Sequence, residues 1–154
     1  MRTQAFLVAV CWAILVPTGA GTSAAVCQVG PPKTVSPTGS RLWTVNHNGK
    51  FVASAAYVNP DGSIWLKAPW WAAGPHGRPK RGPRGVLHIT GKRLDRADSP
   101  LRAKTQQVWV DGYGGSGVWA VVLTFPSEGC WSVKGRVQRT THTFRLLVTK
   151  EPQP

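Results

Sequence analysis

The sequence is poor in acidic side chains, with 6 Asp and Glu residues against 19 Lys and Arg and a formal net charge of +13. No close pair of carboxylates is available for acid–base catalysis. A field of this sign favours anionic partners such as phosphate polymers, lipid headgroups, acidic glycans or nucleic acid. The alternative interpretation is that an arginine-rich composition only keeps the protein soluble.

Metal-ligand motifs are also missing. The chain has one Met, at position 1, and so lacks the thioether ligands that suit Cu(I) in a processed chain. Its four His and three Cys residues form no His-x-His, CxxC or HExxH pattern. We predict no metal and no cofactor. His88 and His142 could meet across strands, which leaves a metal-handling module as an alternative function.

Catalytic motifs are absent as well. Segment 112–117, GYGGSG, has the spacing of a dinucleotide-binding loop, but a strand pattern follows it where a helix is required, so we predict a flexible β-turn. Ser116 is not in a G-x-S-x-G elbow, because Val118 occupies the position of the second Gly. Asp95 and Asp98 lie among arginines and are predicted to make surface ion pairs worth little energy. We predict no enzymatic activity, with a small secreted hydrolase as a second alternative.

The one long apolar run lies at the N-terminus. Arg2 is followed by Ala5–Val16, twelve residues that are short for a bilayer span and typical of a signal peptide. Small residues follow, so we expect cleavage after Ala25 and an exported mature chain with no transmembrane segment. A lipid anchor on Cys27 is the rival, but the residue before it is not the small one that such a signal requires.

No window predicts a helix of ten residues or more. Turn signals such as Asn48-Gly49 and Asn59–Gly62 separate short strand patterns. Eight segments read as strands: Ser40–Val45, Phe51–Val58, Ser63–Lys67, Gly85–Thr90, Lys104–Asp111, Val118–Phe125, Cys130–Val137 and Thr141–Lys150. We predict an antiparallel Ig-like β-sandwich of seven or eight strands over residues 40–150, after a Pro-rich arm at 26–39 and before a flexible tail at 151–154.

Two cysteines remain once Cys11 has left with the signal peptide. An even pair in an exported chain predicts a disulfide between Cys27 and Cys130, with free thiols or an intermolecular bridge as the alternative. In the strand pattern at 130–137, Trp131, Val133 and Val137 share one face and are expected to point inward. Cys130 is on the other face, so we expect Trp131 to anchor the core while Cys130 holds the arm against the surface.

A Trp/Arg-rich stretch at 68–84 is the candidate binding loop. Its four Pro and three Gly residues argue against regular structure. Trp70 and Trp71 are adjacent and point opposite ways in extended chain, so one can enter the core while the other faces out beside cations. The predicted site residues are Trp70, Trp71, Arg78, Lys80, Arg81 and Arg84. The alternative to a recognition surface is that both tryptophan rings are buried and the basic loop is only solvated.

Several motifs in order resemble a group of secreted bacterial proteins whose C-terminal strand pair reads TFPxxGCWxVTG. The segments that carry the resemblance are Leu66–Trp71, His88–Asp95, Ser99–Ala103, Asp111–Gly114, Leu123–Pro126 and Gly129–Arg136. The resemblance spans roughly Leu42 to Val148 and implies export and an Ig-like sandwich. It implies no activity, and hence no functional residues.

Together these observations predict an exported, non-catalytic module of the periplasm or cell envelope. Its expected partner is an anionic envelope polymer or another envelope protein, bound through the candidate loop. Export argues against nucleic acid as the physiological target, and the sequence shows no nucleic-acid-binding motif. The sequence carries no signal for the oligomeric state.

Overall fold

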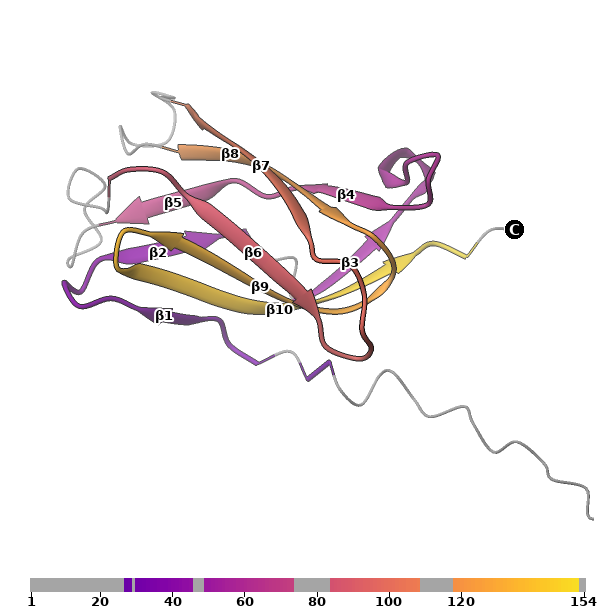
Figure 1. The fold of residues 1–154 in the computed structure, drawn as a ribbon, viewed down its shortest axis with the longest axis horizontal. Helices are drawn as coiled ribbons and strands as arrows, with labels where there is room; N and C mark the ends of the chain where they lie inside the picture. Colours follow the sequence, from indigo (N-terminus) through magenta and orange to yellow (C-terminus); the bar gives the residue numbers. More distant parts are fainter. Residues whose placement is uncertain (1–26, 29, 46–48, 74–83, 109–117, 153–154) are drawn as a thin grey trace, which may run out of the picture.

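The computed structural model describes residues 27–28, 30–45, 49–73, 84–108 and 118–152. The predicted signal peptide at 1–25 lies outside these residues, as do Arg78, Lys80 and Arg81 of the candidate loop. Within the described residues the chain forms ten strands arranged as two sheets that face each other (Figure 1). The predicted all-β sandwich is confirmed, with ten strands in place of seven or eight.

The first sheet, called here the β10 sheet, is built on the C-terminal hairpin. Its members are β1 (Lys33–Val35), β3 (Lys50–Ala53), β6 (His88–Arg93), β9 (Gly129–Val137) and β10 (Thr140–Lys150). β9 lies between β6 and β10 and is antiparallel to both. The other edge of β10 is shared by two short strands, β1 antiparallel at one end and β3 parallel at the other.

The second sheet, called here the β8 sheet, has β8 at its centre. Its members are β2 (Arg41–Thr44), β4 (Ile64–Lys67), β5 (Trp70–Ala73), β7 (Arg102–Val108) and β8 (Val118–Phe125). β7 pairs with one edge of β8, and both β4 and β5 pair with the other edge in one unbroken register. Pro69 separates β4 from β5 because it has no N–H to donate to the ladder.

The two strands beyond the predicted number are β1 and β5. β1 falls in the predicted Pro-rich arm and is only three residues long. β5 falls in the candidate loop, where the burial of all four residues removes the polar–apolar alternation that signals a strand. The predicted strand Phe51–Val58 is wrong beyond Ala53, because a 3₁₀ turn at Ala55–Tyr57 follows.

The core fills the space between the sheets. Trp131, Leu123 and Phe125 have no exposed surface, and the predicted inward face of β9 is confirmed. Trp70 is also fully buried, and its ring lies over Gly135 of β9, where a Cβ atom would overlap the ring. Gly135 therefore lets a large ring from the opposite sheet approach the backbone closely.

The disulfide between Cys27 and Cys130 is present, with the two Cα atoms 5.3 Å apart. Cys130 lies on the outer face of β9, as predicted from the alternation, yet it has no exposed surface. Its partner Cys27 is itself only 9% exposed. The bridge thus ties the start of the arm to the outside of the β10 sheet without entering the core. The described residues contain no helix with the length and apolarity to span a membrane.

Candidate functional site

The structure divides the predicted Trp/Arg-rich site. Trp70 lies in the core, and Trp71 lies on the outer face of the β8 sheet but is only 8% exposed. Trp43 of β2 stacks on Trp71 with 4.9 Å between ring centroids, and Trp43 itself is 49% exposed. The alternate directions of the two tryptophans are as predicted, but the exposed ring on this face belongs to Trp43. Arg84 is exposed.

A groove on the outer face of the β8 sheet is the main concave feature of the described residues. Its floor is the outward side of β8, where Ala120, Val122 and Thr124 are small. Two hollows of about 740 and 440 Å³ adjoin along it and share Lys104 and Val122. We call this feature the β8 groove. Longer side chains from the flanking strands form its walls: Trp65, Lys67 and Pro69 on one side, Arg102, Lys104 and Gln106 on the other.

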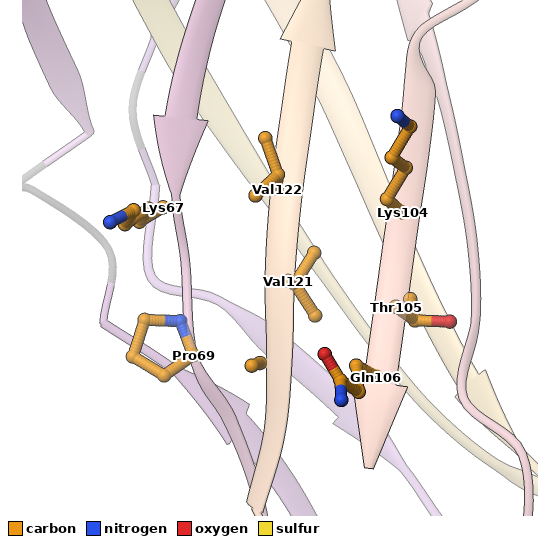
Figure 2. Close-up of a pocket in the computed structure, with 8 residues that line it drawn as sticks. Lys67, Pro69, Lys104, Thr105, Gln106, Val121 and Val122 are labelled. Atoms are coloured by element: carbon orange, nitrogen blue, oxygen red, sulfur yellow. The ribbon is translucent and has the colours of Figure 1, made fainter. Parts of the chain in front are cut away.

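Strand register sets the charge of the groove. Lys67 and Lys104 are both paired with Val122, one from each neighbouring strand. Figure 2 shows Val122 on β8 with a lysine on the strand at either side. Strands in a sheet are about 4.8 Å apart, so the two backbones stand roughly 10 Å from each other across the floor. The register thus places one lysine on each side of the groove floor at the same level of β8.

One end of the groove carries an aromatic ring. Trp65 is paired with Thr124, and its ring packs against Tyr57 with 4.9 Å between centroids. The Lys67 Nζ atom lies 6.0 Å from the centroid of the Trp65 ring. The groove therefore combines cations, a flat ring and an apolar floor within one narrow surface.

One acidic side chain, Asp61, lies next to a residue of the groove wall, Arg102. Among the described residues, no Asp or Glu lines the two hollows. The Asp61 carboxylate lies 3.8 Å from Arg102, and both side chains are well exposed, so water screens the pair. Hydrogen bonds from Ser63 lower the pKa of Asp61 and keep it ionised, and Arg102 contributes less to this shift. Lys67 and Lys104 have no such partner among the contacts of the described residues.

The sequence alone did not reveal this site. Alternation within SIWLK places Trp65 and Lys67 on one face, and that signal was available. Lys104 is far away in the sequence and comes opposite Lys67 only through the register of both strands on β8. The partner strand of an isolated segment cannot be read from its own periodicity.

A second polar cluster lies where the chain leaves β6. The Arg93 guanidinium donates to both oxygens of Asp95, at 2.7 and 3.0 Å, and to Asp98 at 3.1 Å. It also donates to the Ser127 hydroxyl at 2.6 Å, which in turn donates to Asp98. Hydrogen bonding from Arg93 lowers the pKa of Asp95, and the bond to Asp95 raises the pKa of Arg93. The prediction of a surface ion pair is wrong for Arg93 and Asp95, whose side chains are 8% and 4% exposed.

The histidines do not form a metal site with each other. His88 is paired with Arg136 and His142 with Gly135, so the two histidines flank β9 at adjacent positions and lie on opposite faces of the sheet. His88 is exposed and His142 is buried. Among the described residues, no group of three or more His, Cys, Asp or Glu is placed to hold a metal ion.

Neither the known protein families nor the curated proteins include a match to this chain. Its function is therefore argued from the groove and from the chemistry of the residues that line it.

Proposed function

We propose that the protein is an exported, non-catalytic binding module that holds an anionic polymer of the cell envelope in the β8 groove. The observation that carries this proposal is the pairing of Lys67 and Lys104 across Val122, with no acidic residue among the described residues of the lining. Cationic walls along a strand-length groove complement an extended polyanion. The strong excess of Lys and Arg over Asp and Glu would increase the rate of encounter with such a partner.

The disulfide and the N-terminal sequence support an extracytoplasmic compartment. A disulfide persists in an oxidising environment, which supports an extracytoplasmic location. The apolar run Ala5–Val16 supports export through a signal peptide. An envelope polymer is the anionic partner that such a protein would meet.

The β8 groove takes the place of the Trp/Arg-rich loop as the proposed contact surface. Trp70 and Trp71 are too well covered to serve as stacking platforms, whereas Lys67, Lys104 and Trp65 line the groove directly. A contribution from Arg84 and its basic neighbours stays a prediction. No observation on the described residues favours the metal-handling or the hydrolase alternative.

Charge reversal in the groove tests the proposal. We expect the Lys67→Glu, Lys104→Glu double variant to bind both heparin and long-chain polyphosphate at least about tenfold more weakly than the unmodified protein. Binding by the unmodified protein should also weaken as NaCl rises from about 0.05 to about 0.5 M, because salt screens exposed charges. Fluorescence anisotropy of labelled polymer measures both effects.

Lys92→Glu with Lys134→Glu is the matched control. These lysines lie on the exposed outer face of the β10 sheet. Replacing both by Glu changes the net charge by the same amount as the double variant in the groove does. The control should retain binding within about threefold if position matters more than total charge. Equal losses in the two double variants would reduce the interaction to non-specific attraction and reject the groove as the binding surface.

A further inference from the structure

We propose that the polymer in the β8 groove is an anionic polysaccharide, lying along β8 with one sugar ring stacked on Trp65. This inference rests on the proposed function and names the class of its ligand. The evidence for it is the uncharged part of the groove, namely the Trp65 ring and the apolar floor. A ligand made of anionic groups alone would make no favourable contact with these surfaces.

The floor of the groove is apolar over much of its length. Val122, which lies between the two lysines, and Ala120 form an apolar strip along β8, and Pro69 of the wall falls opposite Ala120 in the register of β4 and β5 on β8. From Ala120 to Val122 this strip is about 7 Å long at the rise of an antiparallel strand. A pyranose ring has an apolar C–H face that can cover such a strip, and a phosphate chain has none.

The Trp65 ring stands at one end of this strip in the wall of the second hollow. Its contact with Tyr57 fixes its orientation, so little side-chain freedom is lost when a ligand packs on it. Trp65 is paired with Thr124, and Lys67 and Lys104 are paired with Val122, the next outward-facing residue of β8. The two lysines can therefore bind carboxylate or sulfate groups of the same ligand. Gln106 and Thr124 supply an amide and a hydroxyl for sugar hydroxyl groups.

Polyphosphate and single-stranded nucleic acid fit this surface less well. Polyphosphate would contact only the cations and leave the ring and the apolar strip without a partner. Surfaces that bind single strands present several aromatic rings on which successive bases stack. Within the described part of the chain, Trp65 is the one aromatic residue that lines the two hollows. The groove therefore selects a ligand that alternates apolar ring faces with anionic groups.

The test compares a sulfated polysaccharide with a polyanion that has no rings. We expect Trp65→Leu to weaken heparin binding at least about tenfold, as for a buried aromatic anchor, and to change polyphosphate binding less than about twofold. Trp65→Tyr keeps a flat ring and should retain heparin binding within about threefold. Trp43→Leu removes an exposed tryptophan outside the groove and should affect neither ligand.

A second measurement uses the unmodified protein and does not depend on how the variants fold. Nuclear Overhauser contacts between Trp65 ring protons and sugar protons of a heparin tetrasaccharide are expected, and their absence would overturn the stacking. An equal loss of heparin and polyphosphate binding in Trp65→Leu, or tighter binding of an oligonucleotide than of heparin at matched charge, would also overturn it.

Failure of this inference can be told apart from failure of the proposed function. If Lys67→Glu, Lys104→Glu leaves both polymers bound, then the groove itself is rejected. If that variant loses both polymers while Trp65→Leu shows no selective effect, the groove stands and the polysaccharide is rejected.

Discussion

At the scale of single residues, His142 is the side chain whose burial has the clearest thermodynamic consequence. It points inward from β10, where its ring meets Trp70 edge-on at 5.6 Å and its Nδ1 shares a hydrogen bond of 2.8 Å with the Thr34 hydroxyl. Burial lowers the pKa of His142, so the folded protein holds the neutral ring. An unfolded chain would take up the proton near the ordinary value of about 6.5.

This difference predicts a pH-dependent stability. Below pH 6.5 the unfolded state binds more protons than the folded state, so the free energy of unfolding should decrease as pH falls from about 6.5 towards the lowered pKa of His142. The slope should not exceed about 1.4 kcal/mol per pH unit for one proton. Urea unfolding at a series of pH values measures it.

His142→Gln should remove this slope, because no proton is taken up at that position. The carboxylates with lowered pKa values, Asp95 among them, would lose their contribution only at more acidic pH, so the two effects occupy separate windows. A flat profile between pH 6.5 and 5 in the unmodified protein would contradict the prediction.

At the scale of elements, the Arg93 cluster secures the passage between the two sheets. After β6 the chain turns through Asp95 and Asp98 and enters the other sheet at β7, while Ser127 belongs to the turn between β8 and β9. Arg93 binds all three side chains and lies against Gly129, where a Cβ atom would overlap its guanidinium. One side chain thereby joins two connections that both cross between the sheets.

Replacing Arg93 by Met should destabilise the fold. The Asp95 side chain is 4% exposed and would lose its two hydrogen bonds to Arg93, a loss of about 1–3 kcal/mol for a buried group without that partner. Chemical denaturation measures the change in unfolding free energy.

Arg96→Met is the matched control for that change. The Arg96 side chain is 64% exposed and reaches Asp98 only at 3.9 Å, so its replacement should change stability by less than about 0.5 kcal/mol. Equal effects of the two variants would show that the cluster contributes no more than an exposed ion pair.

At the scale of the whole molecule, the disulfide constrains most of the chain without belonging to the core. It joins residues 103 positions apart, yet Cys130 is on the outer face of β9 and the described part of the arm is held mainly by the three residue pairs between β1 and β10. In the chain-entropy account a loop of this length contributes up to about 4–5 kcal/mol through the unfolded state.

A Cys27→Ser, Cys130→Ser double variant should therefore be less stable but still folded at room temperature. We expect a lowered melting temperature, faster amide exchange in β1 and unchanged protection in β8, β9 and β10. Native-state hydrogen exchange separates these regions. Global loss of protection at room temperature would mean that the bridge is required for the sandwich itself.

The sequence alone was sufficient for the class of fold and for much of its orientation. Alternation along 130–137 placed Trp131, Val133 and Val137 inside and Cys130 outside, because strand geometry directs successive side chains to opposite faces whatever the partner. Counting cysteines sufficed for the disulfide, because a single pair remains after the predicted cleavage. These inferences depend only on local geometry and on arithmetic.

Only the tertiary structure decided which strands are neighbours, and this determined the candidate site. The pairing of Lys67 and Lys104 across Val122, the burial of Trp71 under Trp43 and the enclosure of Asp95 by Arg93 all join residues from different parts of the fold. β5 was missed for the same reason, since a strand covered on both faces loses its alternation. The periodicity of a strand predicts the face on which a side chain lies, whereas the packing of the two sheets determines which residues it contacts.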